Sequence, residues 1–107
     1  MKNARKILVM GDVPRIFITT LESLFRYFQM YFIDLDKERS GEGFRLRVYS
    51  IQPDFVMIRL EDYLKNQEFY DDLIKSFPRC IFWKIDTNKV WRANDIKSAI
   101  IKFKRKF

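Results

Sequence analysis

Short apolar runs bounded by turn residues alternate with helical stripes along the chain. The apolar runs predict strands at residues 6–10, 31–35, 55–60 and 79–85. The third run follows the turn-forming pair Pro53 and Asp54 and is interrupted only by Arg59. An almost unbroken apolar run of this length is typical of a strand buried on both faces in the middle of a parallel sheet. We therefore expect residues 55–60 to form the central strand.

The helical stripes have apolar residues on one face at helical spacing. The first helix is predicted to begin with Asp12 as a cap and Pro14 in the first turn, with a stripe formed by Phe17, Leu21, Leu24, Phe25 and Phe28. A loop at residues 61–62 precedes another helix, which ends at Pro78. This helix is predicted to bury Phe69, Tyr70, Leu73, Ile74 and Phe77. The last helix is predicted to be capped by Asn94, with its inward stripe at Ile96, Ile100 and Phe103.

Two segments allow more than one interpretation. Residues 44–48 alternate as a strand would, which would make a hairpin with residues 31–35, but Phe44, Val48 and Ile51 share a helical face, and we favour a short helix. Residues 89–92 resemble a short strand after a turn at residues 86–88. Because a parallel crossover needs a dozen or more residues, such a strand would pair antiparallel with residues 79–85.

The order of strands and helices predicts a three-layer α/β fold in a single domain, residues 1–107. We expect a mostly parallel five-stranded sheet of the flavodoxin-like type, with an antiparallel edge strand near the C-terminus.

Composition excludes several kinds of chemistry. The chain has 107 residues, no histidine and one cysteine, Cys80, so Ser-His and Cys-His nucleophiles, a zinc cluster and an internal disulfide are excluded. We expect neither a cofactor nor a metal. No apolar run is long enough to span a membrane and no secretory leader is recognisable, so a cytoplasmic protein without membrane contact is expected.

The net charge is +7, from 21 basic and 14 acidic residues. Part of the excess lies in an acid-free C-terminal segment that contains Lys97, Lys102, Lys104, Arg105 and Lys106. A basic balance favours acidic partners such as nucleic acid, an anionic membrane or an acidic protein face. The alternative is a solvated helix end, where cations complement the helix dipole.

The chain resembles a response-regulator receiver domain over roughly residues 4 to 86. The resemblance rests on the first strand ending at Gly11 and Asp12, on Gly41 before the second helix, on the Pro-Asp pair before the third strand, and on residues 71–75 and Pro78 before the fourth. It implies the receiver fold, with Mg²⁺ held between acids and an aspartate phosphorylated at the end of the third strand.

The departures from the family lie where receivers carry out phosphotransfer. Arg59 stands at the phosphoacceptor position, Gly11 replaces the first acid and leaves only Asp12, Lys84 replaces the hydroxyl residue, and Lys89 aligns with the family's lysine. A single carboxylate offers neither the ligands of a hard cation nor a phosphoacceptor. We therefore expect a degenerate, phosphorylation-independent pocket and no enzyme.

Three roles are open for Arg59. It can form an ion pair with Asp12 across adjacent strand ends, replacing the metal, because an Arg near a buried carboxylate needs a partner. It can join Lys84 in an anion pocket. The third role is an exposed side chain with no specific function.

These features predict a pseudo-receiver, a signalling or regulatory module that binds a protein partner. The net positive charge of the chain favours an acidic partner. Its partner surface would include Trp91 and Arg92, typical interface anchors, with Lys97, Lys102, Lys104, Arg105 and Lys106. Alternatively, Trp91 only covers the sheet edge. A homodimer is also predicted, because Phe103 and Phe107 extend the last apolar stripe. The second hypothesis is a nucleic-acid-binding domain that uses the basic C-terminal helix, although no known nucleic-acid-binding motif accompanies the charge.

Overall fold

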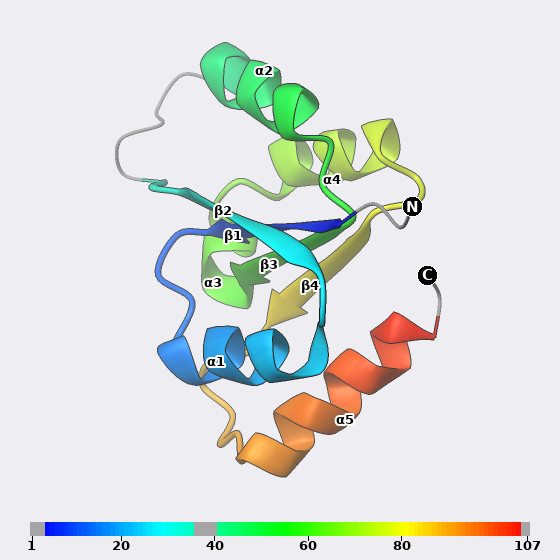
Figure 1. The fold of residues 1–107 in the computed structure, drawn as a ribbon. Coiled ribbons are helices and arrows are strands. Elements are labelled where there is room, and N and C mark those ends of the chain that lie inside the picture. Colours follow the sequence, from blue (N-terminus) through cyan, green and yellow to red (C-terminus); the bar gives the residue numbers. More distant parts are fainter. Residues whose placement is uncertain (1–3, 36–40, 106–107) are drawn as a thin grey trace.

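A parallel sheet lies at the centre of the computed structural model, which describes residues 4–35 and 41–105 (Figure 1). Within these residues its four strands lie in the spatial order β2-β1-β3-β4. Their bounds are β1 Arg5–Met10, β2 Phe28–Ile33, β3 Phe55–Arg59 and β4 Ile81–Ile85. All three neighbouring pairs are parallel, so the C-terminal ends of the strands meet at one end of the sheet.

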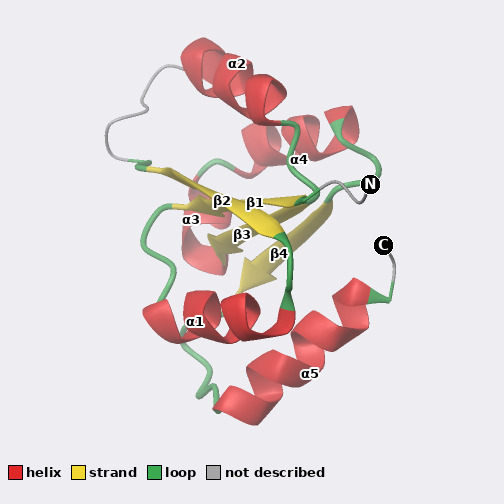
Figure 2. Ribbon diagram, in the orientation of Figure 1, coloured by secondary structure: helices red, strands yellow, loops and turns green. Residues whose placement is uncertain are grey.

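Helices cover both faces of this sheet (Figure 2). On one face lie α1 (Arg15–Leu24) and α5 (Ala93–Lys104), and on the other lie α2 (Gly41–Ile51) and α4 (Gln67–Ser76). The short helix α3 (Leu60–Lys65) follows β3 directly. The three-layer α/β architecture is therefore confirmed. No helix in the described parts of the chain is long and apolar enough to span a membrane.

The two central strands contain the most buried segments of the protein. Residues 7–10 of β1 and 55–58 of β3 are each at most 1% exposed. Alternate side chains contribute to the two cores on opposite faces, as in any strand covered on both sides. The prediction of a central strand at residues 55–60 is thus confirmed in its position, and Arg59 is the first residue of that run to leave the core.

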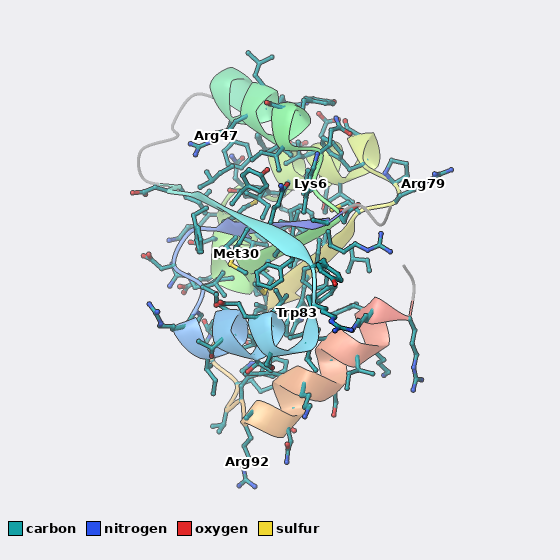
Figure 3. The ribbon with its side chains drawn as sticks, in the orientation of Figure 1. Lys6, Met30, Arg47, Arg79, Trp83 and Arg92 are labelled. Carbon is teal, nitrogen blue, oxygen red and sulfur yellow. The ribbon has the colours of Figure 1, made fainter. Side chains whose placement is uncertain are left out.

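Aromatic rings fill the layer between the sheet and the helices α1 and α5. Trp83 of β4 lies between the sheet and these helices (Figure 3) and meets Phe17 with a centroid distance of 5.4 Å. Trp91 meets the rings of both Phe17 and Trp83, at 5.3 and 5.8 Å. Such edge-to-face contacts add to the free energy gained from burial.

The boundary between the first helix and the second strand differs from the prediction. The helix ends at Leu24, and Phe25 has extended backbone dihedrals of −104° and 126°. The strand β2 begins at Phe28 and not at Tyr31. Both Phe25 and Phe28 still contribute to the core beneath α1, which explains why they continue the apolar stripe although they are not helical.

The loop predicted at residues 61–62 is helical. Glu61 and Asp62 form the first turn of α3, where acidic side chains complement the positive end of the helix dipole. The helix then breaks at Asn66, whose dihedrals are −145° and 49°, and α4 begins at the next residue. One predicted helix is therefore two.

The segment at residues 44–51 is helical, as favoured, and the hairpin alternative is wrong. Residues 89–92 do not form a strand, so the observed sheet is four-stranded and wholly parallel. The physical reason is Trp91, whose indole packs on the core and donates a hydrogen bond of 2.7 Å to the carbonyl oxygen of Asp86. This contact holds Trp91 against the turn that follows β4.

The predicted helix caps are also wrong. Pro14, not Asp12, precedes the first residue of α1, and no side chain caps that helix. Arg92, not Asn94, precedes α5, and its backbone N–H donates to the carboxylate of Asp95 over 3.0 Å. The inward positions of the last helix are confirmed, since Ile96 and Ile100 are fully buried.

Truncating Phe17 tests the aromatic layer. Phe17→Ala should lower the free energy of unfolding by about 3–5 kcal/mol, because it removes a buried ring and leaves a cavity among indoles. Ile16→Ala is the matched control one residue away, where the side chain is 42% exposed. That change should cost less than about 1 kcal/mol. Equal losses for the two variants in chemical denaturation would contradict this packing.

Candidate functional site

The C-terminal ends of β1 and β3 meet at a small polar cavity, which we call the strand-end cavity. It has a volume of ≈ 250 Å³, and its lining includes Gly11, Asp12, Asp34, Leu35, Arg59, Asp62 and Lys65. Of the residues of the predicted pocket, Gly11, Asp12 and Arg59 line this cavity together. Among the described residues no cluster of His, Cys, Asp or Glu side chains is arranged to hold a metal ion.

Arg59 uses its guanidinium on carboxylates that follow it in the chain. Its Nε and Nη2 donate to the two carboxylate oxygens of Asp62 at 2.9 and 3.2 Å, and Nη1 lies 2.6 Å from Oε1 of Glu61. The hydrogen bond to Asp62 is the main cause that raises the pKa of Arg59, and the charge of Asp12 adds the smallest acidic contribution.

The predicted ion pair between Arg59 and Asp12 is therefore wrong in its partner. Helix α3 begins immediately after Arg59, so the residue three positions on is brought back towards the guanidinium. With three of its nitrogens engaged by Asp62 and Glu61, Arg59 also lacks the open fork that would bind an anion.

Gly11 occupies a position that accepts no side chain easily. Its φ is +71°, a left-handed conformation that costs other residues about 1–2 kcal/mol. A Cβ at this position would lie 2.9 Å from Cδ1 of Leu35 and 3.2 Å from Oδ2 of Asp62. The acid that receivers carry here would therefore be strained and would crowd the carboxylate that Arg59 binds.

The structure does not bring the two predicted lysines to the strand-end cavity. Ile85 is the register partner of Arg59, and Lys84 pairs one residue earlier with Ile58. Because side chains alternate along a strand, this offset turns Lys84 to the other face, where its Nζ lies 4.4 Å from the ring centroid of Tyr63. Lys89 lies instead over the ring of Trp91, at 5.0 Å.

Neither Tyr63 nor Cys80 is a ready nucleophile. The hydroxyl of Tyr63 donates to the carboxylate of Asp71, and this hydrogen bond is the main cause that raises the pKa of Tyr63. Burial, helped by the charge of Asp54, raises the pKa of Cys80 to about 12. Both groups therefore stay protonated at neutral pH.

A second hollow, the α5 groove, lies along one side of the last helix. Its volume is ≈ 600 Å³, and it is lined by Lys89, Trp91, Asp95, Ser98, Ala99, Ile101, Lys102 and Arg105. An aromatic ring and two aliphatic side chains thus lie among three cations and one acid. Trp91 packs on the core through its contact with Trp83 and also lines this groove. Its role as an interface anchor stays a prediction.

The predicted basic surface is divided by the structure. Lys102 and Arg105 line the α5 groove, but Lys104 lies on the α1 side, where its Nζ donates to the carbonyl oxygen of Leu24 over 2.7 Å. Lys97 precedes Lys104 by seven residues and so belongs to that same side of the helix. Arg92 projects away from the molecule (Figure 3). Lys106, like Phe107, lies outside the described residues.

Sequence reasoning identified Lys102 and Arg105 but missed Asp62 and the other groove members on α5, namely Asp95, Ser98, Ala99 and Ile101. Residues 95, 98, 102 and 105 recur at intervals of three and four, so they share one helical face. That spacing, read together with Trp91, was the available signal for the α5 groove. The sequence offers no comparable signal for Asp62, because it predicts a loop at residues 61–62 and so no helical turn that would bring Asp62 back to Arg59.

A double-mutant cycle tests the ion pair of Arg59. Its side chain is 26% exposed and that of Asp62 is 12% exposed, so solvent screens the pair only in part. Arg59→Ala and Asp62→Ala should show a coupling free energy of about 1–2 kcal/mol in chemical denaturation, as expected of a half-buried bidentate pair.

The matched control pairs Arg59→Ala with Asp12→Ala, which should be additive to within about 0.5 kcal/mol. A larger coupling with Asp12 than with Asp62 would overturn the assignment.

Comparison of the chain with protein-family models, with curated proteins and with solved structures gives no match.

Proposed function

We propose that this chain is a non-catalytic, receiver-like interaction module that acts in signalling or regulation by binding a protein partner in the α5 groove. The observation that carries the proposal is the composition of that groove, where Trp91 lies among Lys89, Lys102 and Arg105. Aromatic rings and arginine are typical anchors of protein interfaces, and the excess of cations favours an acidic partner.

The topology supports the receiver-like part of the proposal. The strand order β2-β1-β3-β4 is the flavodoxin-like order up to its fourth strand. In this chain α5 follows β4 without a fifth strand between them. The position that a fifth strand would take beside β4 therefore holds no strand in this sheet.

The strand-end cavity supports the non-catalytic part. Phosphotransfer of the receiver type needs an aspartate and a bound divalent cation, and Arg59 stands at the phosphoacceptor position. Its guanidinium is bound to Asp62 and Glu61. The left-handed backbone at Gly11 and the close approach of Leu35 disfavour a second acid beside Asp12.

The geometry favours a protein partner over nucleic acid. A phosphate track needs cations in a continuous row, and here Lys102 and Arg105 are on the groove side of α5 while Lys97 and Lys104 are on the α1 side. The geometry also disfavours a homodimer built on the apolar stripe of α5. Phe103 packs against the rings of Phe55 and Trp83 at 5.6 and 5.5 Å, so it is not left for a second copy to cover.

Charge reversal on the two sides of α5 tests the proposal. Tagged wild-type protein, Lys102→Glu and Lys97→Glu should be compared in pull-downs from cells that contain the native partner. Lys102→Glu should weaken capture roughly tenfold, because it sets an acid against an acidic partner at the groove rim. Lys97→Glu exchanges the same residue type on the other side of the helix and should leave capture unchanged.

Equal loss in both variants would mean that net charge, not the α5 groove, determines binding. Loss of nucleic acid from the captured material in both variants would favour the nucleic-acid alternative.

A further inference from the structure

The strand β4 forms an edge of the sheet beside α5 (Figure 2). The backbone N–H of Ile81 donates to the carbonyl oxygen of Asp54 on the β3 side over 3.0 Å. Because backbone groups alternate in direction along a strand, the N–H and C=O groups of Phe82 and Lys84 point away from β3. Within the part of the chain that the structure describes, no hydrogen bond reaches these outward groups.

The opposite edge of the sheet is treated differently. At β2 the outward carbonyl oxygen of Phe32 accepts a hydrogen bond of 3.3 Å from Nη2 of Arg47. Arg47 reaches this edge from α2 (Figure 3). A charged side chain over an edge is a common device against unwanted strand pairing. The ammonium group of Lys84 lies instead over the ring of Tyr63, so Lys84 does not cover the β4 edge as Arg47 covers the β2 edge.

The α5 groove lies on the same side of the molecule as the β4 edge. Trp91 connects them, since its ring lines the groove and also contacts Trp83 of β4. On α5, Lys104 marks the side that faces α1. Ala99 and Lys102 line the groove on the opposite side of the helix.

A strand laid beside β4 would place alternate side chains on the two faces of the sheet. One row would face Lys84 and Tyr63, and the other row would enter the α5 groove near Lys89 and Lys102. Both rows of side chains of the added strand would therefore face lysines. The one acid lining the groove, Asp95, already accepts the backbone N–H of Arg92.

We infer that the β4 edge and the α5 groove together form one docking surface for an extended, acidic segment of a partner protein, which joins the sheet as an added strand. Main-chain hydrogen bonds to Phe82 and Lys84 would supply affinity, and acidic side chains facing the lysines would supply selectivity. This inference rests on the proposed function and specifies its partner. A second copy of the chain is the weaker occupant, because pairing β4 with β4 would bring the two sets of lysines together on proteins of charge +7.

A synthetic peptide provides the test. The probe is an acetylated and amidated peptide of alternating Glu and Val, long enough to cover residues 81–85, with a fluorescent label for anisotropy at low salt. Two further versions carry N-methyl groups on alternate residues, either on the set whose N–H groups face β4 or on the complementary set. Methylation removes hydrogen-bond donors without changing the charge.

We expect the unmodified peptide to bind and one methylated version to bind about tenfold more weakly or worse, while the other keeps most of its affinity. Amide hydrogen exchange at Phe82 and Lys84 should slow on binding. Lys84→Glu should weaken binding, whereas Lys65→Glu, at a 75% exposed lysine outside this surface, should not. The same peptide with Lys in place of Glu should not bind.

Three outcomes overturn the inference. Equal binding of both methylated peptides, with weakening only by Lys102→Glu, would keep the α5 groove as the partner site but remove strand addition. No binding at low salt would remove the acidic strand as occupant, while the pull-down comparison would still decide the proposed function. Slow exchange at Phe82 and Lys84 without peptide, together with sedimentation as a dimer, would make a second copy the occupant.

Discussion

The ion pair of Arg59 with Asp62 and Glu61 determines what the C-terminal end of the sheet can do. The strand β3 passes into α3 without a loop, and the guanidinium turns onto the acids of the first helical turn. Parallel α/β sheets usually build their sites at this end. Here the arginine neutralises one carboxylate of the strand-end cavity and uses all three of its nitrogens on the acids of α3, so that neither the guanidinium nor Asp62 is left as an unpaired charge.

The lack of a fifth strand in the described sheet shapes the surface beside β4. Trp91 is held against Trp83 and Phe17, so the segment before α5 turns towards the helix instead of pairing with β4. The same contact leaves β4 at the edge of the sheet and places an aromatic ring at one end of the α5 groove. The composition of the α5 groove carries the proposed binding function, and the β4 edge carries the inference that the partner adds a strand.

The sequence predicted those parts of the fold that follow from periodicity, namely the central strand, the helical layers and the helix at residues 44–51. It failed where tertiary contacts decide. Phe28 continues a helical stripe in the sequence, but it lies in a strand and faces the same core from there. Residues 89–92 alternate as a strand would, but the contact of Trp91 with Trp83 prevents the segment from pairing with the sheet. At the site, the ends of β1 and β3 predicted the meeting of Gly11, Asp12 and Arg59. Lys84 was misplaced because an offset of one residue turns a side chain to the opposite face.

The claim that the ion pair of Arg59 leaves the strand-end cavity without receiver chemistry is tested most directly by amide NMR spectra of the wild-type protein during titration with Mg²⁺ and a small acyl phosphate donor. A receiver site would respond with saturable shifts at the residues that line its pocket. The ion pair of Arg59 with Asp62 predicts that the amide signals of Gly11, Asp12 and Arg59 stay unchanged and that the protein gains no phosphoryl group. Saturable shifts confined to these residues, or an added phosphoryl mass, would contradict the account.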